Sequence, residues 1–230
     1  MIKINEYTKI AVNSLSKKLD DNHPEIRAKA AESLGRIGSE TAIPGLLKAL
    51  EDSDGFVRMK AAEALGNIGS EIAIAGLLKA LEDSYFEVCG YAAEALGKIG
   101  SETAIAGLLK ALEDSHWNVR IKAAEALGKI GSEIAIPGLL KALEDSDEYV
   151  RMYAAEALGK IGSEAAIAEL LKALEDSNKD VRRNAAEALG EIGLEEAIPA
   201  LINALSDEED SVRFSATDAI GKIGSRYALT

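Results

Sequence analysis

Cysteine, histidine and proline are scarce in this 230-residue sequence, which contains one, two and four of them. The single cysteine, Cys89, excludes an internal disulfide and is typical of a reducing compartment. The two histidines, His23 and His116, lie 93 residues apart, so they predict neither a metal centre nor a Ser-His or Cys-His catalytic pair. The sequence therefore predicts a chain with no metal, no cofactor and no enzymatic activity.

Long apolar segments and an excess of basic residues are also missing. No apolar run approaches the roughly 18 residues of a membrane span, and the first residues, MIKINEYTKIAVNS, lack the uninterrupted apolar segment of a secretory signal. The chain has 26 Lys and Arg against 39 Asp and Glu, for a formal net charge of −13. Because phosphate backbones are bound mainly through Lys and Arg, we expect no nucleic-acid partner. Since the sequence shows neither a membrane span nor a secretory signal, we expect a cytoplasmic protein with no membrane partner.

What the sequence does contain is a repeat of 31 residues, marked by an arginine column that only Cys89 interrupts. Seven repeats fit, at residues 8–38, 39–69, 70–100, 101–131, 132–162, 163–193 and 194–224. A fixed period of this length marks stacked units that bury their apolar faces against their neighbours. We therefore expect residues 1–230 to form one elongated domain.

Each repeat begins with a predicted helix A. In residues 39–69, apolar residues at helical spacing run from Ala42 to Leu50, and Ser39 is placed to cap the helix. Pro44 lies a few residues inside this pattern, and its missing N–H predicts a late start or a kink.

A second helix, helix B, follows with Ser53 or Asp54 as its N-cap and with apolar positions from Val57 to Ile68. Gly69 predicts a left-handed C-terminal stop, and Gly66 predicts close approach of a neighbouring helix. Because no segment is rich in β-forming residues, the predicted fold class is all-α.

The terminal repeats differ from the five between them. Ser16 replaces the leucine of the Leu47 column in the first repeat, with Lys17 and Lys18 beside it, and Asp218 and Arg226 distinguish the last. Since a terminal repeat must expose one face to water, we expect both to be capping repeats.

The pattern D-x-D-x-x-V-R-x-x-A-A-x-A-L-G-x-I-G resembles HEAT-like repeats, specifically the short class named after phycobilisome (PBS) lyases. The resemblance covers about 217 of the 230 residues. It implies a right-handed α-solenoid of seven two-helix repeats, with helix A outside and helix B lining a concave face. It also implies that Asp52 and Arg58, with their equivalents, form a ladder between repeats. It implies no activity, because fold does not determine function.

The positions that differ between these similar repeats point to a binding surface. They are the columns of positions 54, 55, 56, 59 and 60. On helix B, positions 56, 59 and 60 fall with 63 and 67 in an arc of about 100°, away from the apolar face. We therefore expect this arc to face solvent.

Eight of the ten aromatic residues occupy these variable columns. A core position should be apolar in every repeat, yet Trp117 aligns with Glu148 and Lys179. Aromatic, Met and Arg side chains on accessible surfaces are typical of interface hot spots. Neutral drift at unconstrained positions is the alternative. The predicted partner-binding residues are Phe56, Met59, Tyr85, Phe86, Tyr91, His116, Trp117, Ile121, Tyr149, Met152 and Tyr153.

The leading functional hypothesis is a monomeric, non-catalytic scaffold that binds a protein or peptide in the concave groove. The resemblance suggests one alternative, a bilin-lyase subunit or phycobiliprotein-handling factor. The near-verbatim recurrence of ALEDS and AAEALG suggests another, a consensus-like or engineered array without a native partner. Because Cys89 replaces the arginine of its column, we expect one Asp–Arg pair of the ladder to be missing there. A reactive thiol is the alternative.

Overall fold

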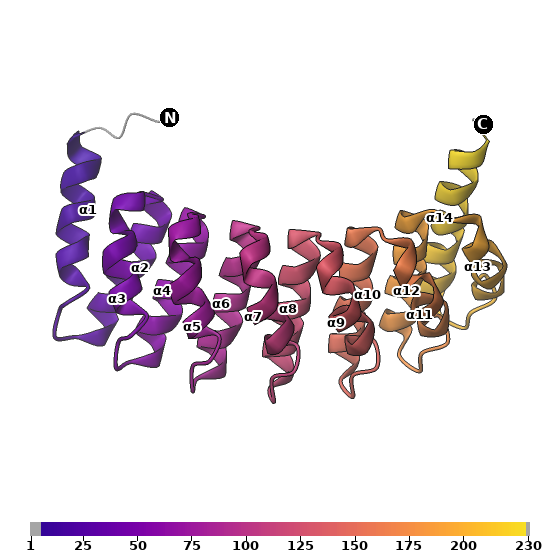
Figure 1. The fold of residues 1–230 in the computed structure, drawn as a ribbon, viewed down its shortest axis with the longest axis horizontal. Helices are drawn as coiled ribbons and strands as arrows, with labels where there is room; N and C mark the ends of the chain where they lie inside the picture. Colours follow the sequence, from indigo (N-terminus) through magenta and orange to yellow (C-terminus); the bar gives the residue numbers. More distant parts are fainter. Residues whose placement is uncertain (1–5, 229–230) are drawn as a thin grey trace. The chain divides into compact units, whose positions relative to one another are not determined.

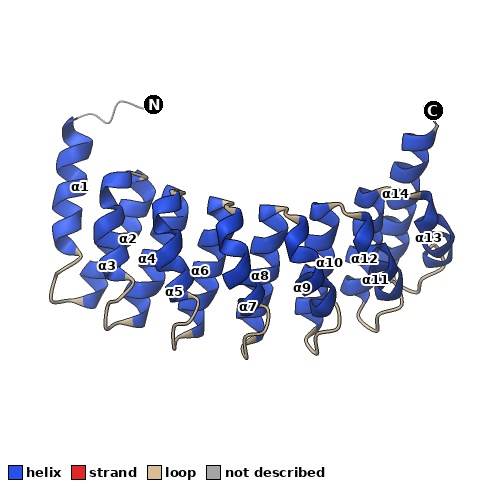
Figure 2. Cartoon of the chain, viewed as in Figure 1, coloured by secondary structure: helices blue, strands red, loops and turns tan. Residues whose placement is uncertain are grey.

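The computed structural model describes residues 6–228, and the regular structure in this range is helical throughout (Figures 1 and 2). The predicted all-α fold class is therefore confirmed. Odd-numbered helices are the A helices: α1 (Glu6–Lys18), α3 (Ile43–Ala49), α5 (Ile74–Ala80), α7 (Ile105–Ala111), α9 (Ile136–Ala142), α11 (Ile167–Ala173) and α13 (Ile198–Ala204). Even-numbered helices are the B helices: α2 (Pro24–Ile37), α4 (Gly55–Ile68), α6 (Phe86–Ile99), α8 (Trp117–Ile130), α10 (Glu148–Ile161), α12 (Lys179–Ile192) and α14 (Asp210–Tyr227).

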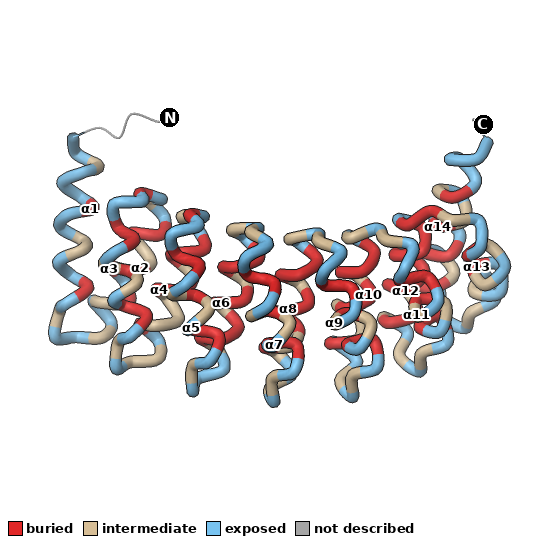
Figure 3. The backbone as a smooth tube through the Cα atoms, in the orientation of Figure 1, coloured by how far each residue is buried: buried red, intermediate tan, exposed pale blue. Residues whose placement is uncertain are grey.

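The chain divides into two compact units, unit 1 (residues 1–107) and unit 2 (residues 108–230), and the boundary falls within α7. In unit 1, α1 packs on α2, α3 on α4 and α5 on α6, and in unit 2, α9 packs on α10, α11 on α12 and α13 on α14. Within each unit, each helix B also packs on the next helix B. The buried residues therefore recur along the helices of each unit (Figure 3). The single-domain organisation and the right-handed course of the chain remain predictions.

Helix A starts later than its apolar pattern does. A 3-10 turn, Glu40–Ala42, precedes α3, and Pro44 lies in the first turn of α3, where a missing N–H breaks no helical hydrogen bond. This confirms the late start. The predicted Ser39 side-chain cap is wrong, because the Ser39 carbonyl accepts the Ala42 N–H at 3.0 Å instead. The Ser39 hydroxyl lies 2.8 Å from Thr41 Oγ1.

Helix B has the predicted ends. Asp54 Oδ1 accepts the N–H groups of Phe56 and Val57 at 2.9 and 3.2 Å, which confirms the N-cap. Gly69 ends α4 in the left-handed region with φ 73°, where a side chain would be strained.

Successive B helices approach so closely that a glycine on one meets an alanine on the next. A Cβ atom placed on Gly66 would lie 2.7 Å from Ala95 Cα, and one on Gly159 would lie 2.8 Å from Ala188 Cα. Real Cβ atoms do not tolerate such distances, so the small residues set the spacing of the B helices. The predicted close approach at Gly66 is therefore confirmed.

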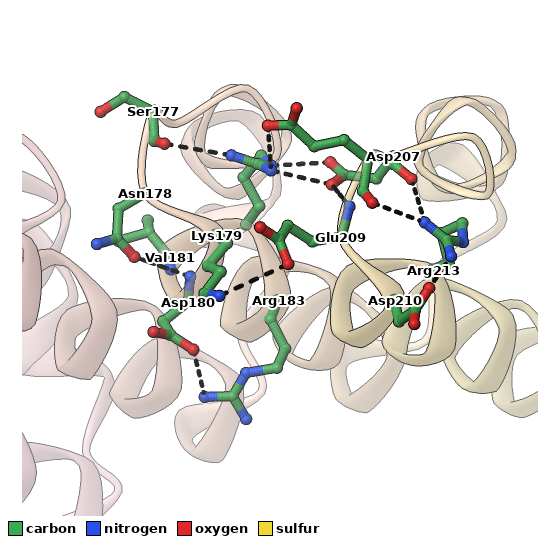
Figure 4. Close-up of polar contacts among 12 residues, drawn as sticks. Ser177, Asn178, Lys179, Asp180, Val181, Arg183, Asp207, Glu209, Asp210 and Arg213 are labelled. Carbon is green, nitrogen blue, oxygen red and sulfur yellow. Dashed lines mark hydrogen bonds and ion pairs between the residues drawn. The ribbon is translucent and has the colours of Figure 1, made fainter.

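An arginine on each of five B helices joins one repeat to the next. Arg182 donates to both carboxylate oxygens of Asp207, at 2.8 and 2.9 Å, and to the Asp176 carbonyl at 3.0 Å. Figure 4 labels Asp207 together with Arg213 of the last repeat, which donates to the Asp207 carbonyl at 2.7 Å. The side chains of Arg182 and Asp207 are 10% and 12% exposed, so this bidentate pair is largely shielded from solvent. The same ladder is formed by Arg27–Asp52, Arg58–Asp83, Arg120–Asp145 and Arg151–Asp176. The predicted ladder is therefore confirmed.

The ladder holds the aspartate pKa values below their usual range. Hydrogen bonds from Arg182, opposed by partial burial, lower the pKa of Asp207. For Asp176, burial acts most strongly and in the raising direction, but the hydrogen bonds from Arg151 and the Asn178 N–H outweigh it and the pKa is lowered.

The last repeat ends differently from the others. Gly224 occupies the column of Gly69 but lies inside α14, which runs to Tyr227. Gly224 therefore does not form the left-handed stop that Gly69 forms. Arg226, in the last turn of α14, donates to the carbonyls of Ile192 and Glu191 at 2.9 and 3.0 Å. It thereby satisfies carbonyl groups at the C-terminal end of α12.

Gly159→Ala is expected to destabilise unit 2, by about 1–3 kcal/mol, because the new methyl group meets the backbone of Ala188. Gly221→Ala is the matched control, since it changes the same column where no atom lies within 4 Å. Helix propensity should make that control neutral or stabilising. Urea unfolding followed by circular dichroism measures both, and equal effects at the two positions would contradict the close-packing argument.

Stability should fall as the pH drops below the usual aspartate pKa of 3.8. A carboxylate with a lowered folded-state pKa stabilises the fold above its unfolded-state pKa, and this contribution is lost as the pH falls through the folded-state value. Asp207→Asn should lower stability at pH 7 and reduce the further loss on acidification. Urea midpoints between pH 7 and pH 2 would test this, and an unchanged acid dependence in the variant would contradict it.

Candidate functional site

Exposed aromatic residues gather where the B helices of unit 1 begin. Phe56, Tyr85 and Phe86, which we call the aromatic edge of unit 1, are all exposed. The rings of Tyr85 and Phe86 have centroids 6.0 Å apart, and Lys60 Nζ lies 5.7 Å from the Phe56 ring centroid. Next to them, Glu87 Oε2 is buried without a hydrogen-bond partner among the described residues.

Unit 2 has an aromatic edge of its own, formed by His116, Trp117 and Tyr149 at the starts of α8 and α10. The His116 and Trp117 ring centroids are 5.7 Å apart and stacked, and the Trp117 and Tyr149 centroids are 6.4 Å apart. Trp117 is 46% exposed and Tyr149 is 53% exposed. His116 Nδ1 also accepts the Asn118 N–H at 3.2 Å, so this histidine is an N-cap.

The other predicted residues lie further along the B helices and are less accessible. Met59, Tyr91, Met152 and Tyr153 are half-buried. Ile121 is 5% exposed, so its predicted place on a solvent-facing arc is wrong. The reason is that a B helix inside the stack has other B helices packed against it, which cover the flanks of the arc.

A hollow of about 770 Å³ lies on the helix-B side of unit 2. Four positions of helix B line it, and α10, α12 and α14 each contribute one side chain at every position. Each position therefore forms a row of three side chains across the helices. The first two rows, nearest the helix starts, hold Met152, Arg183 and Phe214, then Tyr153, Asn184 and Ser215. The next two hold Glu156, Glu187 and Asp218, then Lys160, Glu191 and Lys222.

The lining of this hollow combines apolar and polar groups. Phe214, on the last B helix, is 76% exposed. Asn184 is only 6% exposed, and its amide nitrogen donates to the Met152 carbonyl at 3.2 Å. Ser215 Oγ donates to Glu187 Oε1 at 2.8 Å. Sequence reasoning identified Met152 and Tyr153 but missed Asn184 and Phe214 as members of one site.

Most charges in the hollow have a partner within it. Lys160 Nζ lies 2.5 Å from Glu156 Oε1, and Lys222 Nζ lies 2.6 Å from Glu191 Oε1 and 3.0 Å from Asp218 Oδ2. The hydrogen bond to Glu191, followed by that to Asp218, raises the pKa of Lys222. Such solvent-accessible pairs are weak, so an incoming charged group can replace them at small cost.

Cys89 is buried, and its thiol donates to the Asp83 carbonyl at 3.2 Å. Arg58 makes the equivalent contact to the Asp52 carbonyl at 2.9 Å. The cysteine therefore keeps the local contact of its column but, having no guanidinium, cannot form the bidentate pair.

Within residues 6–228, no group of three or more His, Cys, Asp or Glu side chains is arranged to hold a metal ion. None of the helices in that range is both long enough and apolar enough to cross a membrane.

Comparison with known proteins identifies the repeat. The family model for HEAT repeats matches residues 12–89, 74–145, 106–187 and 167–230. A search of curated proteins found no match.

Several solved structures are similar to the chain. The complex of CpcE and CpcF of phycocyanin lyase from Nostoc sp. PCC7120 is 27% identical with a TM-score of 0.61, covering 93% of this chain and 94% of that chain. An engineered protein is 29% identical with a TM-score of 0.59, covering 94% of this chain and 68% of that chain. A designed armadillo repeat protein in complex with the peptide (KR)4 shares the fold at 23% identity, with a TM-score of 0.58 and coverage of 92% and 99%.

Substitutions should separate the surface residues of unit 2 from the core. Ile121→Ala is expected to cost about 2–4 kcal/mol of unfolding free energy, because the side chain is buried. Tyr149→Ala should change stability by less than about 1 kcal/mol, because half of the ring already contacts water. Urea unfolding measures both, and a greater loss for Tyr149→Ala than for Ile121→Ala would contradict these placements.

Proposed function

Because the chain belongs to the HEAT-repeat family, we propose that it is a non-catalytic scaffold that binds a protein or peptide through its aromatic edges and helix-B side. The observation that carries this proposal is that residues differing between otherwise copied repeats are also exposed aromatics. Phe56, Tyr85, Phe86, Trp117 and Tyr149 all leave more than a third of their surface accessible.

The energetics support binding over stability as the role of these rings. Exposed aromatic side chains contribute little to folding, yet each can add about 2 kcal/mol or more when a partner buries it. The rings of His116 and Trp117 are already stacked in the free chain, and side chains arranged before binding lower the entropy cost of association.

The recurring charged residues support a non-catalytic role. The aspartates and arginines that repeat most regularly are occupied by the ladder, which joins one repeat to the next. Their lowered aspartate pKa values keep them ionised, so these carboxyl groups do not supply protons near neutral pH.

A bilin-lyase subunit or phycobiliprotein-handling factor is the second candidate. The similarity to the CpcE and CpcF complex of phycocyanin lyase favours it, and that structure is itself an assembly of two chains. A change in the absorbance spectrum of a bilin on mixing with the chain would support this candidate, and an unchanged spectrum would count against it.

The scaffold proposal predicts that peptides selected from a random library on the immobilised chain bind through the aromatic edge. A double variant, Trp117→Ala with Tyr149→Ala, should weaken the binding of peptides selected on unit 2 by at least about tenfold. Fluorescence anisotropy measures the affinities.

The matched control removes exposed apolar surface elsewhere. Ile72→Ala with Ile134→Ala changes two residues that are 66% and 62% exposed beside helix A. This control should leave affinity within about twofold, since surface truncations away from an interface have small effects. Selected peptides that bind the Trp117 and Tyr149 variant as well as the original chain would contradict the proposed edge.

A further inference from the structure

The last repeat exposes apolar side chains that a following repeat covers elsewhere in unit 2. A Cβ atom placed on Gly138 would lie 3.3 Å from Leu112 Cδ1, so each helix A covers the leucine that follows the previous helix A. Leu205 occupies this leucine column in the last repeat and is 38% exposed, whereas the column is at most 9% exposed in every earlier repeat. Ile202, one turn earlier on α13, is also exposed. The last helix A therefore presents apolar surface to water.

The close contact between B helices also ends without a partner in the last repeat. A Cβ atom on Gly190 would lie 2.8 Å from Ala219 Cα, whereas Gly221, in the same column of α14, has no atom within 4 Å. We call the surface formed by Ile202, Leu205, Arg213 and Gly221 the tail surface.

The first repeat exposes the opposite side of the interface between repeats. Ile26 is 41% exposed, whereas the valines of its column in the six later repeats are all 0% exposed. Ser33 occupies the column of Ala219, so a small residue stands where a preceding glycine would approach. Ser14 likewise occupies the column of Gly138. We call the surface formed by Ser14, Asp21, Ile26 and Ser33 the head surface.

The arginine ladder is incomplete at these two surfaces in a complementary way. Arg213 belongs to the arginine column but meets no following repeat within residues 6–228, and its side chain is 38% exposed, against 10% for Arg182. Asp21 belongs to the aspartate column and meets no preceding arginine in that range. Arg213 pairs with Asp210 instead, and Asp21 pairs with Lys18 at 2.8 Å. Asp210 and Lys18 are 94% and 58% exposed, so both pairs are weak and can be exchanged at small cost.

The two terminal repeats carry opposite net charge. Residues 8–38 contain six basic and four acidic side chains, whereas residues 194–224 contain two basic and seven acidic ones. The first repeat is thus positive within a chain of net charge −13. Two tail surfaces would repel each other, whereas a tail surface and a head surface attract.

We propose that the tail surface of one chain binds the head surface of a second copy of this chain, in the register that joins consecutive repeats. Arg213 then meets Asp21 of the second copy, and Gly221 meets Ser33 of the second copy. The contact does not use the aromatic edges, so it goes beyond the proposed scaffold function, and it differs from the monomer expected from the sequence. Because the two surfaces are different, every added copy leaves one of each free, and the assembly grows beyond a dimer.

Sedimentation velocity of the full chain tests this self-association. Two separate chains lose rotational and translational freedom that covalently joined repeats do not lose, so we expect association over about 1–300 μM. The weight-average sedimentation coefficient should rise over this range to values above that of a dimer. Association should weaken in about 0.5 M salt, because the attraction between the terminal repeats is screened.

Gly221→Gln should weaken the association by at least about tenfold, because the added side chain fills the space that the second copy would occupy. The variant should fold, since no atom of its own chain lies within 4 Å of the new Cβ atom. Gly224→Gln is the matched control on the same helix. Its column lies away from the contact between repeats, because Cβ atoms on Gly69 and Gly131 also meet no atom within 4 Å. This control should associate within about twofold of the original chain.

Ser33→Gln blocks the head surface and identifies the direction of assembly. This variant alone and Gly221→Gln alone should both stay monomeric. An equal mixture of the two should form a dimer and nothing larger, because one intact head surface and one intact tail surface remain for each pair of chains.

Three results would overturn the inference: an original chain that stays monomeric up to about 300 μM, a Gly221→Gln variant that associates as the original does, or a Ser33→Gln variant that still dimerises alone. The last would show that two tail surfaces meet. Peptides selected on the aromatic edges test the scaffold function separately, whichever of these results is found.

Discussion

The close contact between consecutive B helices is the constraint on which the rest of each unit depends. Where Gly159 faces Ala188, the two backbones are so near that no side chain larger than the alanine methyl fits between them. This spacing brings Arg182 within reach of Asp207 and buries the pair. It also leaves each interior B helix only a narrow accessible strip. Variation between repeats is therefore confined to that strip and to the helix starts.

Much of the architecture could be predicted from the repeat itself. Because each position recurs in several repeats, the residues at that position could be compared between repeats. The helix pairs, the Asp54 cap and the left-handed Gly69 could therefore be predicted from the sequence. The predicted Ser39 side-chain cap was wrong because the backbone forms a 3-10 turn there. In this turn the Ser39 carbonyl, and not its hydroxyl, accepts the hydrogen bond from the Ala42 N–H. Residue type alone does not distinguish these two ways of starting a helix.

The candidate site was predicted less completely. A helical wheel treats one helix in isolation, so it placed Ile121 on an exposed arc that neighbouring B helices in fact cover. Trp117 and Tyr149 were placed correctly on the surface because they lie at the helix start, beyond those neighbours. The hollow was missed because it is defined by three helices together. The signal was present in the sequence as a column in which lysine gives way to Tyr153, Asn184 and Ser215.

The C-terminal part of α14 differs from the other B helices in a way that bears on how repeats can be added. Arg226 already occupies carbonyl groups of α12, and the helix passes through Gly224 without the left-handed residue that would turn the chain into another helix A. A repeat appended after this point would have to displace the arginine and break the helix. A copy inserted between two interior repeats would meet the same glycine, alanine and aspartate neighbours as the original. An internal duplication would thus reuse the contacts that already exist between interior repeats.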